Sequence, residues 1–234
     1  MTAKNYISQI SDTYPGYLAN WPPDIAISVG DVGSLSINGF QKFASIDNLQ
    51  LQKTESANLS QLEGTIINSP NGSVVIDFSD SKGFVLQATE VISEAAADLV
   101  SVEKKILNNL TEEWRHDWYI VTGVQIATVA TIIVSNGNDA AVGLTGTFGA
   151  PPLMLAGTAQ LSVNTSTSRG STVSWITSKF PVLMYQALKF TDWPLPPPQH
   201  LFYNLTGRLP YKTIERLPQM EALTVEEVLR HFKE

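Results

Sequence analysis

The sequence predicts an α+β fold: a twisted, mostly antiparallel β-sheet flanked by helices, with a short helical C-terminal tail. Runs of alternating apolar and polar residues are separated by Gly, Pro and Asn, which is typical of short strands joined by turns. The segment 90–110 instead repeats apolar residues every three or four positions, as a helix does. The end of the chain, after a proline-rich segment, carries a second amphipathic pattern of helical period.

The composition excludes several classes of protein. The chain has 234 residues, no cysteine and a formal net charge of −7. Charged residues make up 16% of it, against about 25% in average soluble domains, and 41 Ser and Thr fill the deficit. The lack of cysteine excludes disulfide scaffolds, zinc–thiolate sites and thiol enzymes. The negative charge argues against a nucleic-acid-binding protein.

The first 90 residues predict one helix and a series of strands. Tyr6, Ile7, Ile10 and Tyr14 recur at helical spacing until Pro15-Gly16 ends the helix. After it we expect strands at 25–29 and 34–37 and a turn at Asn38-Gly39. Residues 40–51 then form a strand or loop, and 52–60 a loop. A hairpin of 65–67 and 73–78 and a strand at 84–86 follow.

The longest predicted helix covers 90–110. Its apolar side is formed by Val91, Ala95, Leu99, Val102, Ile106 and Leu110. Charged residues, among them Glu94, Asp98 and Lys105, fall on the opposite side. A stripe of this kind usually packs on a core, and we expect that role here.

Residues 118–190 are nearly free of charge. Asp139, Arg169, Lys179 and Lys189 are the charged residues in this stretch. β-Branched residues and interspersed Thr argue against a transmembrane helix at 118–138, and period-two alternation predicts a strand. A buried central sheet is also apolar and uncharged, but it would not need so many hydroxyl side chains. An apolar face opposite a hydroxylated face suits a strand that later lines a membrane barrel.

Two segments are long enough to cross a membrane as strands, since about 9–11 residues suffice. They are 124–134 and 156–166. The residues expected to meet lipid are Val124, Ile126, Ile132 and Val134 in the first segment, and Leu161 and Val163 in the second. Gln125, Ala127 and Thr131 lie opposite the first set. We also expect a hairpin of 159–165 and 171–176 with its turn at 167–170, and a strand at 181–190 that closes the sheet.

The C-terminal residues 199–234 are predicted to be a linker and tail, separate from a main unit at 1–198. The tail holds equal numbers of acidic and basic residues, so the whole net charge lies in the main unit. Thr224 and Glu227 have the spacing of a helix capping box. The residues that share one side of this helix are Val225, Val228, Leu229 and Phe232.

No motif supports an enzyme. His116, His200 and His231 are far apart in the sequence and have no metal-ligand spacing. Gly30 and Gly33 lie between strands and indicate a tight turn rather than a phosphate-binding loop. We therefore expect no catalytic residue, no bound cofactor and no metal site, and replacing any of the three histidines by Ala should leave activity largely intact.

Three segments resemble the pore-forming domain of the gasdermins, including their bacterial and fungal members. Residues 29–35 leading to 43–49 are similar to the family's Gly-Asp-Leu strand and the Ser-Leu segment after it. Residues 118–124 are similar to the Tyr-Val-Val-Thr-Glu strand that follows a long helix, and 170–176 through 181–188 to the closing strands. Their order and spacing agree over about residues 25–190.

The resemblance implies a monomer that proteolysis releases to form oligomeric β-barrel pores in membranes, as an effector of cell death and antiviral defence. The tail would then be the autoinhibitory peptide, bound through Val225, Val228, Leu229 and Phe232. We expect the activating protease to cut between 205 and 219, near Leu205, Arg208 or Arg216. The expected partners are that protease, membrane lipids and further copies of the chain, and no nucleic acid.

Two features depart from the family pattern and one alternative stays open. Many bacterial members carry an N-terminal cysteine for lipidation, and animal members are basic where they meet acidic lipids, whereas this chain has neither feature. No signal peptide is visible, so we expect a cytoplasmic protein that moves to the inner face of the cell membrane on activation. The alternative is a soluble, non-enzymatic binding or scaffold module with an apolar groove.

Overall fold

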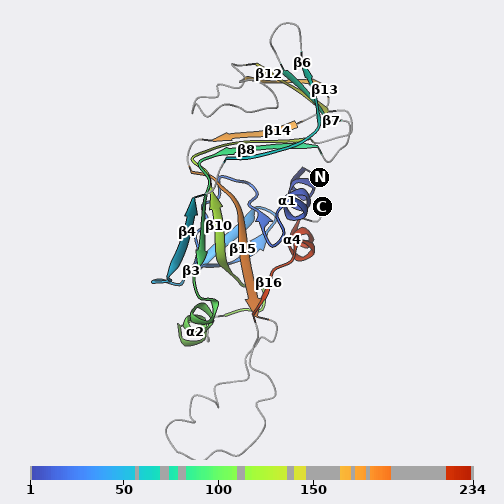
Figure 1. The fold of residues 1–234 in the computed structure, drawn as a ribbon. Coiled ribbons are helices and arrows are strands. Elements are labelled where there is room, and N and C mark those ends of the chain that lie inside the picture. The colour runs from blue at the N-terminus through green and yellow to red at the C-terminus, as the bar shows by residue number, and fades with distance from the viewer. Residues whose placement is uncertain are drawn as a thin grey trace, which may run out of the picture.

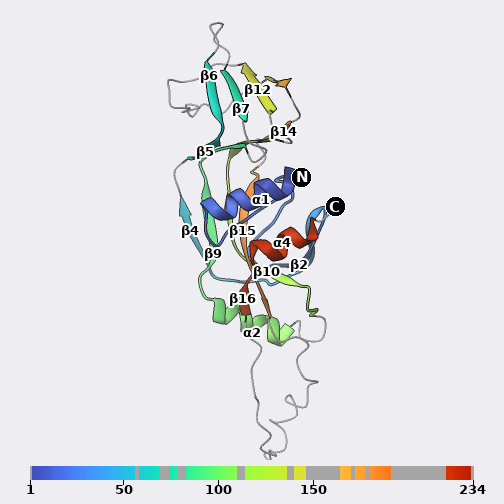
Figure 2. The same cartoon turned by 90° about the vertical axis from the view of Figure 1, so that its right-hand side faces the viewer.

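The computed structural model describes residues 2–55, 58–68, 74–78, 83–109, 114–135, 140–145, 164–169, 172–177, 180–190 and 220–232. Within these residues antiparallel strands form three sheets accompanied by three helices, so the fold is α+β, as the sequence predicts. The helices are α1 (Thr2–Thr13), α2 (Leu99–Asn109) and α4 (Val225–His231). Figures 1 and 2 show the sheets following one another along the long axis of the molecule, with α2 near one end.

We call the three sheets the large, middle and distal sheet. The large sheet contains β1 (Leu18–Ala19), β2 (Asp31–Ser36), β3 (Gly39–Ser45), β4 (Leu51–Glu55), β9 (Ile92–Ala96), β10 (Tyr119–Ile126), β15 (Val182–Phe190) and β16 (Met220–Ala222). The middle sheet contains β5 (Leu59–Glu63), β8 (Phe84–Thr89), β11 (Val129–Ser135) and β14 (Thr172–Thr177). The distal sheet contains β6 (Thr65–Asn68), β7 (Val74–Phe78), β12 (Ala140–Thr145) and β13 (Asn164–Arg169).

Four long stretches of chain each pass through all three sheets. We call them composite strands I (β4, β5, β6), II (β7, β8, β9), III (β10, β11, β12) and IV (β13, β14, β15). Neighbours pair in the order I-II-III-IV in every sheet, because β4-β9-β10-β15, β5-β8-β11-β14 and β6-β7-β12-β13 are each hydrogen-bonded in sequence. The protein therefore contains one four-stranded ribbon that is bent twice.

Composite strands II and III keep a single register through both bends. Ala95 pairs with Gly123 in the large sheet, Phe84 with Val134 in the middle sheet, and Val74 with Leu144 in the distal sheet. Each step along one strand between these pairs is matched by one step along the other. Strands I and II likewise keep one register from Leu51–Ala96 to Glu63–Phe84. The bends therefore leave the pairing of strands II and III unchanged, whereas strands I and II change register between the middle and distal sheets, from Glu63–Phe84 to Thr65–Asp77.

The bends divide the apolar residues among separate cores. The middle sheet packs one face, including Phe84, Leu86 and Ile132, into the main core beneath α1. Its other face, including Val85 and Ile133, packs against the distal sheet in a second core with Ile76, Phe78 and Ala140. A third core, which includes Val102, Ile106, Trp114 and Phe190, lies between α2 and the large sheet.

Helix α1 forms where the sequence predicts it and covers the main core. Tyr6, Ile7 and Ile10 are fully buried among the residues of that core, because their spacing places them on one side of the helix. The chain leaves the helix at Pro15-Gly16, where Gly16 has a φ of +84° that favours glycine.

The predicted helix over 90–110 is wrong in its first half. Residues 92–96 form strand β9, which is hydrogen-bonded to β10 on one side and β4 on the other. Backbone hydrogen bonds to these two strands determine the conformation of 92–96, although the spacing of Val91 and Ala95 also fits a helix. The helix begins after Asp98, whose carboxylate accepts a hydrogen bond from the backbone N–H of Val100. Val102 and Ile106 then pack inward, as predicted.

Three predictions for the N-terminal half also need correction. Residues 25–29 are irregular, and the strand begins at Asp31, because the backbone N–H of Gly30 donates to Val121 and that of Ser28 to the Asp31 carboxylate. The hairpin at Asn38-Gly39 forms with Ile37 and Asn38 in its turn. The segment 52–60 contains parts of β4 and β5 rather than a loop, and its polar character reflects the exposure of every residue of β4.

The second half of the chain differs from prediction where it changes sheets. The run 118–138 contains two strands, separated at Ala127 and Thr128, where the chain passes from the large to the middle sheet. Among the described residues, the two segments of the predicted hairpin of 159–165 and 171–176 do not pair with each other. Residues 167–169 lie inside β13, which pairs with β12, whereas β14 pairs with β11. Strand β15 lies inside the large sheet rather than closing it, and the hairpin of β6 and β7 is confirmed.

Candidate functional site

The described part of the tail, residues 220–232, adds a strand to the large sheet. Strand β16 pairs antiparallel with the end of β15, and Glu221 lies opposite Lys189. The backbone N–H of Leu223 donates to the carbonyl of Ala187 at 2.9 Å. This strand was not predicted, because three residues are too few to show a period. The tail is therefore held by backbone pairing as well as by side chains.

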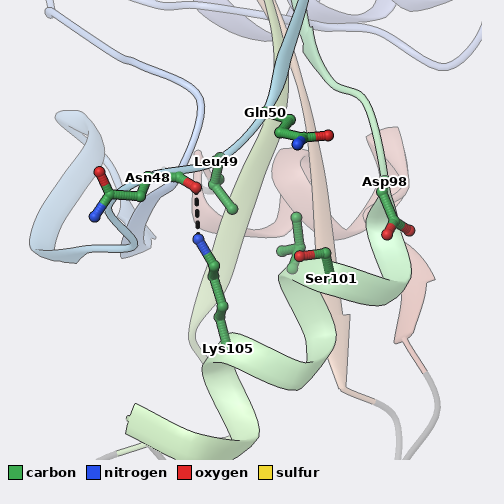
Figure 3. A pocket seen from close by; sticks show the side chains of 7 residues that line it. Asn48, Leu49, Gln50, Asp98, Ser101 and Lys105 are labelled. Carbon is green, nitrogen blue, oxygen red and sulfur yellow. Dashed lines mark hydrogen bonds between the residues drawn. The ribbon is translucent and has the colours of Figure 1, made fainter.

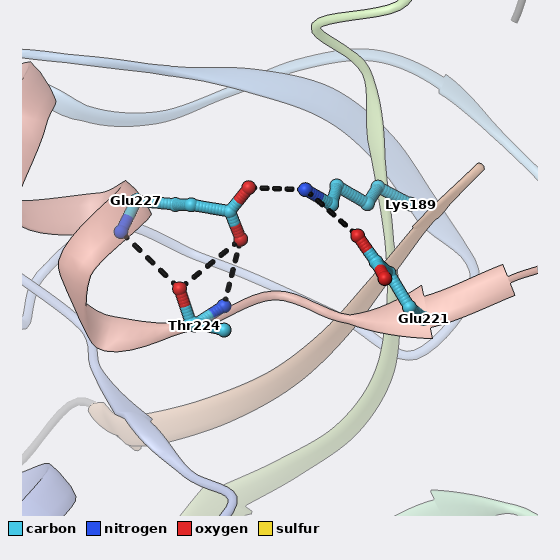
Figure 4. Close-up of polar contacts among 4 residues, drawn as sticks. All are labelled: Lys189, Glu221, Thr224 and Glu227. Atoms are coloured by element: carbon cyan, nitrogen blue, oxygen red, sulfur yellow. Dashed lines mark hydrogen bonds and ion pairs between the residues drawn. The ribbon is translucent and has the colours of Figure 1, made fainter. Parts of the chain in front are cut away.

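Helix α4 begins at a capping box, as the sequence predicts. The Thr224 hydroxyl accepts a hydrogen bond from the Glu227 backbone N–H, and the Glu227 carboxylate accepts one from the Thr224 backbone N–H at 3.1 Å. This reciprocal arrangement satisfies donors that a short helix would otherwise leave open. It also turns the Glu227 carboxylate back toward β15 (Figure 4).

The apolar side of α4 packs on the body of the protein. Val228 is 1% exposed and Leu223, just before the helix, is 6% exposed. Val225, Leu229 and Phe232 are partly buried against the main core. The helix contacts α1 and β2, and the two helices lie side by side in Figure 2. The four tail residues predicted to contact the body therefore do so, and whether that contact inhibits the protein is a separate matter.

Lys189 joins β15 to both elements of the tail. Its ammonium forms ion pairs with Glu221 of β16, at 3.0 Å, and with Glu227 of α4 (Figure 4). Burial alone would lower the pKa of Lys189, but hydrogen bonds to Glu227 and Glu221 and their negative charges outweigh it and raise the pKa. Burial alone would raise the pKa of Glu227, and the hydrogen bonds from Lys189 and Thr224 lower it instead.

The sequence missed Lys189 and Glu221 as a pair. Lys189 is one of four charged residues in 118–190, which was the available signal that it has a specific partner. The partner itself could not be named, because Glu221 follows Lys189 only after a long intervening segment. The pairing of β16 with β15 brings them together.

The predicted membrane residues lie along composite strand III. Val124 and Ile126 are on β10 in the large sheet, whereas Ile132 and Val134 are on β11 in the middle sheet. Val124, Ile132 and Val134 are buried in the main core, and Ile126 packs against it. These four residues thus contact one core, but Ile120, which the same period-two pattern includes, lies in the third core, and odd-numbered Val121 lies in the main core.

The opposite face of β11 is buried too, which the sequence does not predict. Ile133 lies in the core between the middle and distal sheets, and Thr131 is 4% exposed. Among the described residues the Thr131 hydroxyl has no hydrogen-bond partner. The folded distal sheet covers this hydroxylated face, so alternation along the strand separates two cores rather than core and solvent.

Five predicted site residues fall outside the described residues. Leu161 and Val163 are the predicted membrane residues of the second segment, and Leu205, Arg208 and Arg216 belong to the predicted cleavage region. Their roles stay predictions.

A shallow polar pocket of about 350 Å³ lies at the start of α2 (Figure 3). Its lysine, Lys105, donates hydrogen bonds to the backbone carbonyls of Asp47 and Asn48, and Asp98 caps the helix. These groups serve the fold and leave no converging set of donors for a ligand. Among the described residues, no group of three or more His, Asp and Glu is placed to hold a metal ion.

Within the described part of the chain, no helix combines the length and the apolar character needed to cross a membrane.

Comparison with known proteins gives a likeness in structure but none in sequence. No protein-family model matches the chain, and no curated protein matches its sequence. Among solved structures it is similar to the cryo-EM structure of the gasdermin A3 membrane pore, with 13% identity, a TM-score of 0.33, and coverage of 81% of this chain and 90% of that chain. At this identity and TM-score the likeness carries no conclusion about function, which has to be argued from the contacts of the chain itself.

Proposed function

We propose that the protein forms membrane pores when its tail is released by proteolysis. In this proposal the ribbon of composite strands straightens at the bend between the middle and distal sheets and enters the membrane. The tail holds the ribbon in its bent form until the covalent link at 191–219 is cut. The observation that carries the proposal is the single register that strands II and III keep through both bends.

Because the register of strands II and III is unbroken, straightening needs no exchange of partners between these two strands. Strand I has to shift by five residues along strand II in the distal part of the ribbon. In a straight ribbon, residues an even number apart share a face. At the described positions of strands II and III in the middle and distal sheets, which are β7, β8, β11 and β12, one face is then entirely apolar. Its residues are Val74, Ile76, Phe78, Phe84, Leu86, Ala88, Ala130, Ile132, Val134, Ala140, Val142 and Leu144.

The other face of the straightened ribbon is mixed and mostly neutral. It carries Gln87, Thr89, Thr131 and Ser135, together with Asp77 and small or apolar residues. An apolar face opposite a wettable one is the pattern of a barrel strand between lipid and a water-filled lumen. Asp80 and Lys82 fall between Phe78 and Phe84 in the sequence. They have opposite charges and would be neighbours on the apolar face of the strand.

The bent fold keeps this apolar face out of water in two places. Phe84, Leu86 and Ile132 are covered by α1 in the main core, and Ile76 and Phe78 are covered by the middle sheet. Lipid chains are about as apolar as these cores. Transfer of the face from core to lipid therefore costs little hydrophobic free energy, whereas exposure to water would cost about 25 cal/mol for each Å².

The tail suits the role of a releasable lock. It is held by a few apolar side chains, by the pairing of β16 and by the ion pairs of Glu221 and Glu227 with Lys189 of the body, which suits a segment that is tethered to its site. A tether keeps the effective concentration of the tail high, and cleavage removes that advantage. The same reasoning predicts that a nicked tail dissociates on dilution.

Assembly would use the free edges of the ribbon. Among the described strands of the middle and distal sheets, strands I and IV are the outer ones, and they run antiparallel to one another. Open strand edges are templates for pairing with another chain. A head-to-tail arrangement of copies can close into a ring.

The decisive experiment uses a protease site inserted in 199–215 and liposomes loaded with a self-quenched dye. We expect the intact chain to release no dye and the nicked chain to release it. The matched control carries Leu188→Cys and Ala222→Cys. These residues face each other in a non-hydrogen-bonded pair of β15 and β16, where Cα atoms lie about 4.5 Å apart, a distance that a disulfide can span.

With that disulfide formed, the nicked chain keeps its tail and should stay inactive until it is reduced. The chain has no other cysteine, so the bond is unambiguous. Equal dye release before and after nicking would overturn the role of the tail, and no release in either state would overturn the pore function. The soluble binding module would then be the better account of the apolar residues.

A further inference from the structure

Strand β15 has an outer edge that is capped in the large sheet. On its side away from β10, β1 pairs with Tyr185 and Met184, and β16 pairs with residues 188–190. Ala187 and Leu223 form a hydrogen-bonded pair, so Lys189 and Glu221, two residues further, form the next one. The backbone groups of β15 that β16 occupies are those an added strand would use.

The opposite edge of composite strand I is open. Strand β4 pairs with β9 and with no other strand among the described residues, and all five of its residues are exposed. The N–H of Ala97 donates to the carbonyl of Gln50, which sets the alternation along this ladder. The backbone N–H groups of Gln52 and Thr54 therefore face β9, and that of Lys53 faces outward.

The two edges match in direction. Strand β4 runs antiparallel to β15, because β9 and β10 lie between them and each pairing is antiparallel. Strand β16 is also antiparallel to β15. A second copy placed beside the first in the same sense therefore brings its β4 to the β15 edge in the direction that β16 now has.

Charge favours the same occupant. Removal of the tail takes away Glu221 and Glu227 and leaves Lys189 without these two partners. Strand β4 ends in Glu55, which has no ion pair among the described residues, whereas Lys53 is already paired with Glu94 of its own copy. A carboxylate of β4 can thus replace those of the tail.

We propose that β16 is an edge cap: it occupies the edge of β15 onto which β4 of a second copy adds when the tail is withdrawn. This inference rests on the proposed function and extends it. Beyond covering an apolar surface, the tail prevents copies of the chain from joining through the large sheet. Withdrawal of β16 alone, without cleavage and without a membrane, then suffices for self-association.

The test withdraws β16 from the full chain by Glu221→Pro. Proline at 221 removes an N–H that faces β15, whereas Ala222→Pro removes one that faces away, and Glu221→Gln removes only the charge. We expect loss of the monomer and a mass that grows with concentration for Glu221→Pro, by light scattering of the eluting protein. Both controls should stay monomeric.

A second substitution identifies the partner edge. Lys53→Pro removes an outward N–H of β4, a position where an edge strand tolerates proline, and Lys53→Ala keeps that N–H while losing the same charge. Added to Glu221→Pro, the first should restore the monomer and the second should not. Lys53→Pro and Lys53→Ala are also compared in the nicked chain, in which β16 carries no substitution. The result then does not depend on a proline in the tail.

The outcomes separate this proposal from the pore function. If Glu221→Pro and the nicked chain stay monomeric in solution, or if they assemble equally with Lys53→Pro and Lys53→Ala, the edge cap is wrong. Dye release by the nicked chain in either case leaves the pore function standing. Self-association that depends on the N–H of residue 53, without any dye release, supports the cap and overturns the pore.

Discussion

Lys189 of β15 forms ion pairs with Glu221 of β16 and Glu227 of α4 (Figure 4). One ammonium group thus connects the longest strand of the large sheet to both elements of the tail. Glu227 also closes the capping box of α4 with Thr224, so the same carboxylate stabilises the first turn of the helix and binds the helix to the body. The order of the tail and its attachment are therefore coupled.

Lys189→Met should weaken the attachment of the tail. The substitution removes both ion pairs and leaves Glu227 bound to Thr224 alone, which we expect to cost about 1–2 kcal/mol because the group is four-fifths buried. Lys53→Met is the control, since the Lys53–Glu94 pair is more exposed and should be worth at most about 1 kcal/mol. Hydrogen exchange of the α4 amides measures the difference, and equal effects of the two substitutions would contradict it.

The same contact should make tail attachment depend on pH. The lowered pKa of Glu227 contributes stability above the ordinary glutamate value of 4.5, and this is lost as pH falls through the lowered pKa. The raised pKa of Lys189 contributes stability below 10.5, and this is lost as pH rises through the raised pKa. Attachment should be strongest between these limits.

Hydrogen exchange of α4, corrected for its intrinsic pH dependence, tests this expectation. In wild type, protection should decrease on acidification below about pH 4.5. In Lys189→Met the same change should be much smaller, because the partner that lowers the pKa of Glu227 is missing. An identical pH profile in both proteins would show that other groups govern the attachment.

Val228→Ala should loosen the tail by removing packing instead of charge. Val228 is 1% exposed, and loss of two carbon atoms should cost about 2 kcal/mol. If this cost lowers the free energy of local opening of the tail, the exchange rate of the α4 amides rises about thirtyfold. Glu226→Gln, at an exposed position of the same helix, should change exchange by a few tenths of a kcal/mol through the helix dipole. Comparable effects at both positions would argue against packing as the main contact.

The sequence predicted the parts of the fold that local pattern determines. Helix α1, the hairpin of β6 and β7, the capping box and the apolar side of α4 all follow from residue spacing and turn chemistry. The helix expected at 90–110 failed because pairing with two neighbours made a strand of 92–96, and such pairing is not a local property.

Only the apolar contacts of the candidate site were predictable from the sequence. Val228 and its neighbours showed the apolar side of the tail, but β16 and Lys189 depend on a contact between distant segments. Thr131 was expected on a water-facing surface, and the folded distal sheet buries it. Its hydroxyl has no hydrogen-bond partner among the described residues, and its place on a water-facing surface stays a prediction.

Gly33 lies inside β2 rather than in the predicted tight turn, and Gly33→Ala should destabilise the fold. A Cβ at residue 33 would lie 2.0 Å from the carbonyl oxygen of Gln41 on the paired strand β3, and backbone cannot move aside. We expect the free energy of unfolding to fall by roughly 3 kcal/mol or more, measured by thermal unfolding.

Gly123→Ala is the control, because its Cβ would meet the side-chain oxygen of Gln186 at 2.6 Å, which can rotate away. Its cost should stay within about 1 kcal/mol. Equal costs would show that both contacts are equally rigid.

The sharpest test of strand insertion compares two adjacent isoleucines. Ile132 and Ile133 are the same residue type, are both 0% exposed, and lie on opposite faces of β11 in different cores. As single cysteines in this cysteine-free chain, both should be protected from a charged, membrane-impermeant maleimide in the intact protein. After nicking with liposomes present, Ile132→Cys should stay protected by lipid, and Ile133→Cys should react from the lumen, because period-two alternation places them on opposite faces.

The nicked variants without liposomes are the control, because they show how much reactivity comes from opening of the fold alone. Protection of both residues would mean that the ribbon stays bent, reaction of both would mean unfolding, and reaction of Ile132→Cys alone would place the lipid face on the wrong side of the strand. Each of these three results contradicts the insertion of strand III as proposed.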